Sequence, residues 1–418
     1  YNTVIFGGHG IATLEVITYH TLALGFIAST FKSSEGKMSK QRTVEIFNTG
    51  VTTVSTYLLQ AVLGFGITLI AAMLMKDFFA AAGVLLPFGY GQGTGQAMNY
   101  GTIYETEFGF DGGKSFGLTI AALGFLSASI GGVIHLNLLK KRGKIKWDPS
   151  VVETAEPIEE EIQAANEIPM QGSMDKTTVQ IAYVFCAYFI AFLLMSALGS
   201  LIPGMRSVIF GFNFLLGVLA ATVLKTVMNA LQKRNIIHRH YTNDFLLTRA
   251  TNFFYDIMVT ASIAAIRLGT IGKYWGVLLA MGISGLVLTY AYVYFVCRKL
   301  FPGYCEQQFL AMFGMLTGTA STGIILLREI DGDFKTPVAD NLVYQNFPAM
   351  IFGFPILLLA TMAPTQPYMT LGIVAVFMIA INILLFRSFL FRKKIKNKRK
   401  RVSEKKSSCI KKEFLYRK

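Results

Sequence analysis

Long apolar stretches separated by short polar segments run along most of the chain. A helix needs about 17–25 mostly apolar residues to cross the hydrocarbon core of a bilayer. Nine stretches are long enough: residues 10–32, 47–75, 114–138, 177–202, 207–229, 245–268, 274–300, 340–363 and 367–391. The pattern therefore predicts an all-α polytopic membrane protein.

Two glycine-rich segments, residues 87–97 and 314–323, interrupt this pattern. Glycine is unfavourable inside a helix because it loses more backbone freedom on folding than other residues. Within hydrocarbon, non-helical backbone is tolerated only where it is buried in protein or lines a water-filled cavity. We therefore expect a re-entrant loop near residues 78–99 and another near residues 304–330. Such segments at corresponding places in two halves are typical of secondary transporters with inverted repeats.

The two halves also correspond in their order along the chain. A shift of 227 positions places residues 47–138 on the second half, and it places Gly91 on Gly318. The helix that precedes each unit aligns at a shift of 236 positions. We therefore predict a first repeat over residues 1–139 and a second repeat, of opposite orientation, over residues 177–363.

Composition agrees with a membrane protein, since the mean hydropathy is +0.49 and only 15% of the residues are charged. Most of the net charge of +15 lies near the end of the chain, where Lys and Arg outnumber Glu by fifteen to two between residues 387 and 418. A basic segment directly after an apolar helix is the usual cytoplasmic flank of a membrane protein, and it attracts anionic lipid headgroups. The tail at residues 392–418 therefore gives no reason to expect a nucleic-acid partner.

The remaining basic connections orient the chain. They are residues 32–42, 140–146, 225–239 and 298–299. If the start of the chain lies outside, nine spans and two re-entrant loops place all of these connections on the cytoplasmic side, as the positive-inside rule requires. The first loop then enters from outside and the second from inside. We expect a protein of the cytoplasmic (plasma) membrane, with a cytoplasmic linker at residues 140–176 and a cytoplasmic C-terminus.

The first glycine segment resembles that of the sodium/glutamate symporter family, which carries a glycine-rich re-entrant loop in each half. The first loop of that family contains a Gly-His-Gly-Thr-Gly run. Gly91, Gly93, Thr94 and Gly95 match this run, and Gln92 replaces its histidine.

The second glycine segment resembles the second loop of the same family. Gly314, Gly318 and Thr322 match the family pattern, while Ser321 stands where the better-known members have proline. Asn252 falls on an asparagine at the start of the matching helix. The substituted loop residues indicate a divergent branch of the family.

The resemblance covers about residues 15–363. The first two helices of the family have no counterpart before residue 10, so we expect the first repeat to be N-terminally incomplete. An extra transmembrane helix within residues 364–391 has no counterpart in the family. The resemblance implies a homodimer in which a transport domain moves against a scaffold and carries sodium with an acidic amino acid.

The residues of both loops suit such a substrate by their own chemistry. Exposed backbone N–H groups at a helix start favour an anion, while carbonyl and hydroxyl oxygens favour sodium. We therefore predict substrate-binding residues in the first loop at Gly91, Gln92, Gly93, Thr94 and Gly95, and in the second at Gly318, Thr319, Ser321 and Thr322. The alternative is close packing of helices by small residues.

Three ionisable or amide side chains extend this predicted site. Arg328 is the predicted ligand of a substrate carboxylate, because a guanidinium group pairs with a carboxylate through two hydrogen bonds. The alternative for Arg328 is a local pair with Glu329 or Asp331. Asn252 and Asp256 lie one turn apart in a predicted helix, and we predict that they coordinate sodium, because an ionisable group at membrane depth is costly. Their alternative is a structural hydrogen bond within the bundle.

Other classes of function fit the sequence less well. An intramembrane aspartyl protease needs an aspartate in a Gly-x-Gly-Asp sequence, and the nearest match, residues 330–333, begins with isoleucine. We therefore expect no enzyme. A non-transporting receptor or assembly protein has no need of two symmetric broken segments. The four cysteines lack CxxC spacing and histidine neighbours, so we expect neither disulfides nor a cofactor, and only Na⁺ as coupling ion.

Overall fold

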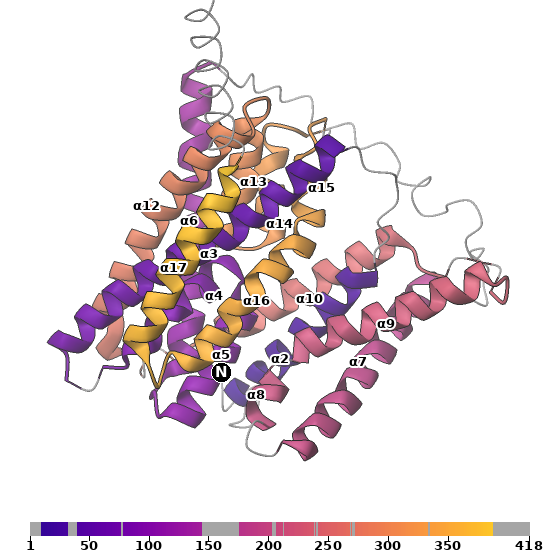
Figure 1. Cartoon of the computed structure of the whole chain (residues 1–418), viewed down its shortest axis with the longest axis horizontal. Helices are drawn as coiled ribbons and strands as arrows, with labels where there is room; N and C mark the ends of the chain where they lie inside the picture. Colours follow the sequence, from indigo (N-terminus) through magenta and orange to yellow (C-terminus); the bar gives the residue numbers. More distant parts are fainter. Residues whose placement is uncertain are drawn as a thin grey trace, which may run out of the picture.

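The computed structural model of the chain describes residues 10–31, 40–76, 78–143, 175–202, 206–211, 213–237, 239, 241–267, 269, 272–332 and 335–387. Within these residues the structure is a bundle of helices and contains no β-strand (Figure 1). The sequence therefore predicted the all-α class correctly. Most of the predicted linker at residues 140–176 and all of the predicted tail at residues 392–418 lie outside the described residues.

The helices follow the hydrophobic pattern closely. The long ones are α2 (Gly10–Phe31), α3 (Lys40–Leu74), α6 (Gly113–Lys141), α7 (Lys176–Leu201), α9 (Asn213–Lys233), α10 (Asp244–Ala264), α12 (Trp275–Leu300), α16 (Asn346–Met362) and α17 (Pro367–Leu385). The shorter ones are η1 (Ala80–Val84), α4 (Leu85–Gly91), α5 (Thr94–Phe108), α8 (Arg206–Gly211), η5 (Gly272–Tyr274), α13 (Cys305–Thr317), α14 (Ala320–Arg328) and α15 (Val338–Tyr344). Eight helical stretches of the described residues are long and apolar enough to cross a membrane, as expected of a multi-pass membrane protein.

One predicted span differs from the rest. α10 forms as a helix, but it is not among the eight stretches apolar enough to cross a membrane. Its exposed residues Arg249, Asn252, Asp256 and Thr260 recur at helical spacing, so a polar stripe runs along one face of α10, with the exposed Phe253 and Ile263 beside it. Two other predicted spans are each made of two helices, α8 with α9 and α15 with α16.

α2 and α10, the two helices that the sequence aligns at a shift of 236 positions, pack directly against each other. α7 and α9 lie beside them, at the right of Figure 1. Gly25 permits the close approach, because a Cβ atom there would lie only 2.5 Å from the Tyr255 ring. Glu15 of α2 also pairs with Lys114 of α6 at 3.0 Å and with Arg267, just after α10, at 3.1 Å.

α3 is the central helix of the remaining bundle, and it contacts η1, α4, α12, α16 and α17. Gly64 of α3 crosses η1 so closely that a Cβ atom on it would lie 2.1 Å from the backbone oxygen of Gly83. The largest hydrophobic core draws buried side chains from α3, α4, α5, α6 and α12. α3 therefore reaches from the outer helices of the bundle to the short helices that carry the glycine segments.

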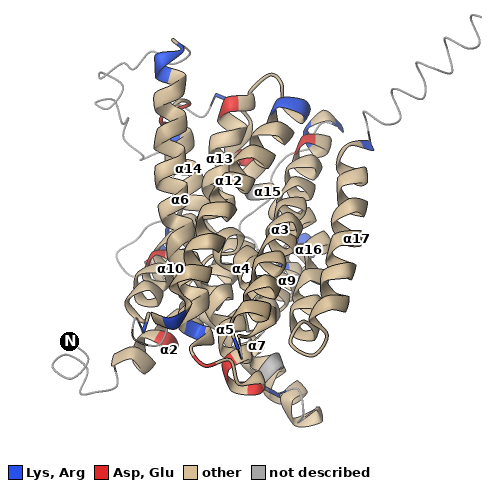
Figure 2. Ribbon diagram, turned by 90° about the vertical axis from the view of Figure 1, so that its left-hand side faces the viewer, with Lys and Arg blue, Asp and Glu red and all other residues tan. Residues whose placement is uncertain are grey.

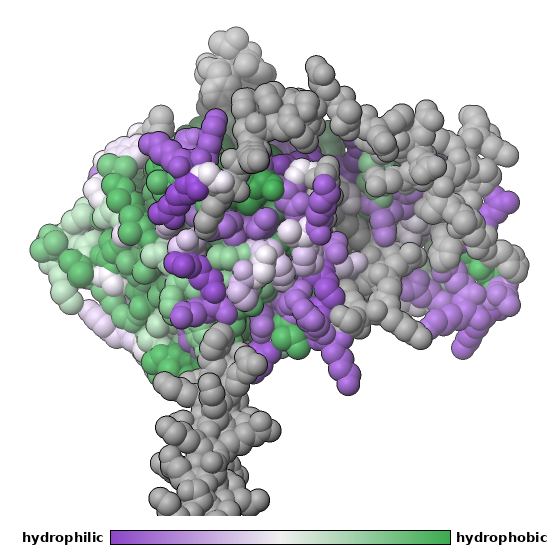
Figure 3. All heavy atoms as spheres, turned by 90° about the horizontal axis from the view of Figure 1, so that it is seen from above, coloured by the Kyte–Doolittle hydropathy of each residue, from purple (hydrophilic) through white to green (hydrophobic). Residues whose placement is uncertain are grey.

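The surface agrees with a membrane environment. Charged residues lie mostly toward the two ends of the helices (Figure 2). Seen from one end, the molecule has a broad hydrophobic side, and hydrophilic residues gather over the middle of that end (Figure 3). Large apolar side chains such as Phe189, Ile283 and Val287 are exposed on α7 and α12. Lipid tails would cover such residues, which in water would form unfavourable patches.

Candidate functional site

The first glycine segment forms two short helices with a break between them. α4 ends at Gly91 and α5 begins at Thr94, so only Gln92 and Gly93 are non-helical. Gly93 has φ 83° and ψ −176°, a conformation that is essentially restricted to glycine. No side chain caps the start of α5, so the first N–H groups of this helix lack a capping partner.

The second glycine segment is broken in the same way. α13 ends at Thr317 and α14 begins at Ala320, with Gly318 and Thr319 between them. The hydroxyl oxygen of Thr319 accepts a hydrogen bond of 3.3 Å from the backbone N–H of Thr322 and so caps α14. The predicted irregular segments are thus real, but each is shorter than expected, because most of their glycines lie within helices.

The two breaks lie next to each other. A Cβ atom on Gly93 would be 4.0 Å from the backbone oxygen of Gly318 and 4.0 Å from Cγ2 of Thr319. α4 and α13 are also in contact. The N-terminal ends of α5 and α14 therefore meet, and each carries a partial positive charge that favours an anion. The first N–H groups of α5 also lack a side-chain cap.

α6 supports both breaks from one side. A Cβ atom on Gly117 would lie 2.3 Å from the backbone oxygen of Ala97 in α5, and one on Gly124 would lie 2.4 Å from the backbone oxygen of Thr317 in α13. Larger residues at either position would push α6 away from these backbones. Glycine in α6 therefore allows one straight helix to fix the first turn of α5 and the end of α13 relative to each other.

Buried polar atoms without a hydrogen-bond partner gather around the breaks. Five of the eight such atoms found among the described residues belong to three glutamines and a threonine there: Gln60 Oε1, Thr94 Oγ1, both side-chain amide atoms of Gln96, and Gln345 Oε1. Thr94 and Gln96 lie in the first turn of α5. Unpartnered buried polar atoms are rare in native proteins and cost about 1–3 kcal/mol each. Their concentration marks a place where a polar ligand would complete the hydrogen bonding.

Gln60 and Gln345 reach the break from other helices. The Nε2 group of Gln60, on α3, donates to the backbone oxygen of Leu316 at 3.0 Å. The Nε2 group of Gln345, between α15 and α16, contacts Sδ of Met315 at 3.4 Å. Both contacts involve the last turn of α13, so two further elements supply amide groups to the same place.

Two of the predicted binding glycines have a packing role. A Cβ atom on Gly91 would lie 2.1 Å from the Tyr57 ring, and the Tyr57 hydroxyl donates to the backbone oxygen of Gly91 at 2.9 Å. A Cβ atom on Gly95 would lie 2.5 Å from Leu22 and 2.9 Å from Sδ of Met258. These two glycines serve close helix contact, which was the alternative interpretation, whereas Gly93 faces the second break.

The other predicted loop residues remain near the breaks. Gln92 and Thr319 are half-buried between helices, and Thr94 is fully buried in the first turn of α5. Ser321 and Thr322 are half-buried in the first turn of α14. These five residues therefore stay together as the polar part of the candidate site.

The structure does not bring Arg328 to the breaks. It is the last residue of α14 and it is exposed. Nine residues at about 1.5 Å each separate the two ends of α14, so Arg328 lies roughly 12 Å from the start of the helix. In this conformation the side chain of Arg328 therefore cannot bind a carboxylate that lies between the breaks.

Asn252 and Asp256 are also separated from the breaks. α10 passes α5 through Met258, whose sulfur lies near Gly95. Asp256 is two residues earlier, so at about 100° per residue it lies on nearly the opposite side of α10. Both Asn252 and Asp256 are exposed there. The described residues show no group of three or more His, Cys, Asp or Glu side chains suited to a metal ion.

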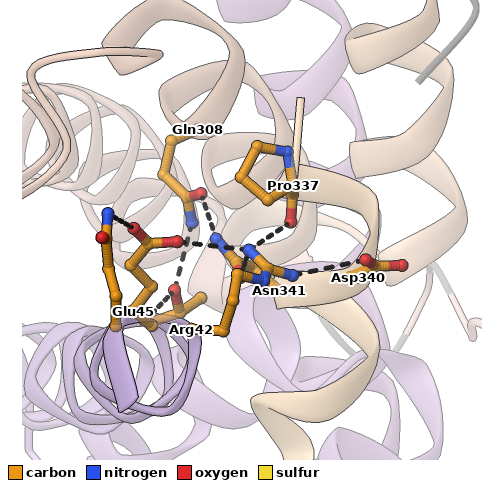
Figure 4. Close-up of polar contacts among 8 residues, drawn as sticks. Arg42, Glu45, Gln308, Pro337, Asp340 and Asn341 are labelled. Atoms are coloured by element: carbon orange, nitrogen blue, oxygen red, sulfur yellow. Dashed lines mark hydrogen bonds and ion pairs between the residues drawn. The ribbon is translucent and has the colours of Figure 1, made fainter. Parts of the chain in front are cut away.

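A partly exposed polar cluster lies at the other end of α13 (Figure 4). Arg42 at the start of α3 bonds to Glu45 at 3.2 Å, to Asp340 at 3.3 Å and to Asn341 at 3.1 Å. Asn341 of α15 in turn donates to Oε1 of Gln308 in α13 at 3.2 Å. The cluster fixes the starts of α3 and α13 to α15, and therefore holds α13 in place behind the break.

Comparison of the chain with protein-family models, with curated proteins and with solved structures found no significant match. The resemblance to sodium/glutamate symporters therefore stays a prediction from the order of the helices, the two glycine segments and Asn252. Tyr57, Gln60 and Gly124 were not foreseen from the sequence, although a glutamine within the apolar run of α3 could have drawn attention to Gln60.

Proposed function

We propose that the chain is a secondary active carrier that moves a small carboxylate across a membrane together with sodium ions, by alternating access. The observation that carries this proposal is the set of unpartnered buried polar atoms at two adjoining helix breaks. Broken helices whose ends meet inside a bundle are how such carriers expose backbone groups to a substrate. An enzyme, a receptor or an assembly protein offers no comparable reason for this arrangement.

The order of the helices supports an inverted repeat. α3, α4, α5 and α6 of the first half correspond to α12, α13, α14 and the pair α15–α16 of the second. The first break begins after Gly91 and the second after Thr317, within one residue of the 227-position shift. Opposite orientation of the two units in a membrane requires three spans between them, so we propose that α10 crosses the membrane together with α7 and α9, with its polar face turned away from lipid. Each helix pair around a break would then form a re-entrant loop.

The chemistry of the breaks favours an anionic substrate. The starts of α5 and α14 offer N–H groups, while Thr94, Gln96 and Thr319 offer neutral polar side chains. Together with the family resemblance, this leads us to propose glutamate or a related acidic amino acid or carboxylate as substrate, Na⁺ as coupling ion, and a homodimer in the plasma membrane that contacts anionic lipid. Elevator-like movement of the domain around α3 against α7 and α9 would change the side from which the breaks are reached.

Uptake into proteoliposomes tests the proposal. Purified full-length chain is reconstituted, and the uptake of labelled glutamate, aspartate and C4 dicarboxylates is measured with an inward sodium gradient, with an equal potassium gradient, and with no gradient. The proposal predicts accumulation above equilibrium of at least one acidic compound with the sodium gradient only. Uptake equal under all three conditions, or no uptake of any acidic compound, would contradict it.

The proposed orientation gives a separate prediction. Gly272 and Gly303 lie just before and just after α12, and a Cβ atom on either would meet open space. In a variant without native cysteines, Gly303→Cys should resist a membrane-impermeant thiol reagent in intact cells, because it follows the basic residues Arg298 and Lys299. Gly272→Cys should react readily. The reverse pattern would invert the proposed topology.

A further inference from the structure

Two neighbouring side chains of α3 reach the ends of both half-helices. Tyr57 donates to the backbone oxygen of Gly91, the last residue of α4, at 2.9 Å. Gln60, one turn further along, donates to the backbone oxygen of Leu316 in the last turn of α13 at 3.0 Å. The side of the breaks that faces α3 therefore presents carbonyl oxygens.

The amide group of Gln60 is enclosed. Gln60 and Thr289 of α12 are both fully buried, and Nε2 of Gln60 donates to the hydroxyl oxygen of Thr289 at 2.9 Å as well as to Leu316. Both hydrogens of the amide are thus used. Oε1 of the same amide has no partner among the described residues. An acceptor that is fully buried beside the carbonyls of a helix end calls for a donor or a cation.

The surrounding atoms favour a cation over a donor. The C-terminal ends of α4 and α13 carry a partial negative charge. A backbone oxygen has two lone pairs, so the carbonyl of Leu316 can accept a second contact beside the hydrogen bond from Gln60. Oε1 of Gln60 and the hydroxyl of Thr289 complete a set of hard oxygen atoms, which suit an alkali or alkaline-earth ion.

The absence of charge in this set favours a monovalent ion over a divalent one. Amide, hydroxyl and carbonyl oxygens are all neutral, and Ca²⁺ or Mg²⁺ sites in proteins normally include carboxylates. We propose that a sodium ion binds beside Gln60, between α3, α12 and the end of α13. This inference rests on the proposed function, for which it names the site of the coupling ion, and it moves that site from Asn252 and Asp256 to Gln60.

A sodium ion at this place would also explain coupling. It would add positive charge beside the breaks, where we propose that N–H groups bind the carboxylate. The ion would therefore strengthen the attraction for an anion within a few ångströms in a low-dielectric interior. Conversely, a bound carboxylate would raise the affinity for sodium by the same factor, because coupling is reciprocal.

The test measures sodium binding without transport. Thermal unfolding of the purified full-length chain in detergent is followed as NaCl replaces KCl at constant ionic strength, and the sodium concentration that gives half of the stabilisation is recorded. Gln60→Asn withdraws the amide by one methylene group and should raise this concentration at least about tenfold, equivalent to about 1.4 kcal/mol. Thr289→Val, which removes only the hydroxyl, should also raise it and serves if Gln60→Asn does not fold.

Two controls sharpen the result. Gln180→Asn alters a glutamine that is equally buried but lies on α7, and should leave the half-maximal concentration unchanged. Asp256→Asn should leave it unchanged as well. If Asp256→Asn abolishes the sodium effect and Gln60→Asn does not, or if potassium stabilises as well as sodium, the site at Gln60 is wrong.

The two proposals can fail separately. Sodium stabilisation that depends on Gln60, in a chain that takes up no acidic compound, would keep the ion site and overturn the carrier. Sodium-driven uptake with a wild-type sodium dependence in Gln60→Asn would keep the carrier and overturn the ion site.

Discussion

Replacement of Gly93 by valine should abolish uptake while the protein still folds in the membrane. The backbone conformation of Gly93 costs any other residue about 1–3 kcal/mol. A Cβ atom at this position would also lie near Gly318 and Thr319 of the second break. The methyl groups of valine would extend beyond this Cβ position, which is 4.0 Å from the backbone oxygen of Gly318 and from Cγ2 of Thr319. Because about 1.4 kcal/mol corresponds to a tenfold change, strain at the upper end of this range should lower uptake in proteoliposomes by roughly 100-fold or more.

Gly66→Val is the matched control for this variant. Gly66 lies in the middle of α3, and a Cβ atom there would meet nothing within 4 Å. Its uptake per folded molecule should stay close to that of the wild type. Normal uptake by Gly93→Val would show that the contact between the breaks does not matter for transport.

Gln96→Leu should lower uptake and at the same time stabilise the protein. Gln96 is buried, and both of its side-chain amide atoms lack a partner among the described residues. Leucine of similar size removes the cost of these atoms, about 1–3 kcal/mol for each unsatisfied group. The same change removes polar atoms that we propose for the substrate. The midpoint of thermal unfolding without substrate should therefore rise, while uptake falls at least about tenfold.

Gln180 is as deeply buried as Gln96, but both of its amide atoms have hydrogen-bond partners, so Gln180→Leu should have the opposite effect on stability. Nε2 of Gln180 donates to the backbone oxygen of Tyr241 at 2.7 Å, and its Oε1 accepts from the backbone N–H of Asn243 at 3.1 Å. Leucine there leaves these backbone groups unpartnered, so the unfolding midpoint should fall. If Gln96→Leu is destabilised like Gln180→Leu, Gln96 is an ordinary structural residue and the candidate site loses its main support.

The sequence predicted the helices well because membrane-spanning segments are defined by length and hydropathy. It also predicted the place of both breaks, since runs of glycine interrupt any helical pattern. The face of α10 that carries Asp256 was readable from the spacing of Arg249, Asn252 and Thr260, which recur with it on one side. The sequence alone does not place that face relative to the breaks.

The contacts between the breaks could not be predicted in the same way. An alignment of the halves matches Gly91 with Gly318, but the residues that touch across the site are Gly93 and the Gly318–Thr319 pair. Gly91 instead accommodates the ring of Tyr57. The way in which α3 crosses both half-helices decides which glycine packs against a helix and which one faces the other break. Only the tertiary structure shows this crossing.

The central claim is that both breaks form one binding site, and the protection of cysteines tests it most directly. Gln92 and Thr319 are half-buried, one at each break, and each is replaced singly by cysteine in a variant without native cysteines. The rate of reaction with a thiol reagent is measured against L-glutamate concentration, with sodium and with potassium, and Gly303→Cys serves as the exposed control. We expect glutamate to protect both cysteines with the same half-maximal concentration, in sodium only, and to leave Gly303→Cys unprotected. Protection of only one break, or of both at different concentrations, would contradict a shared site.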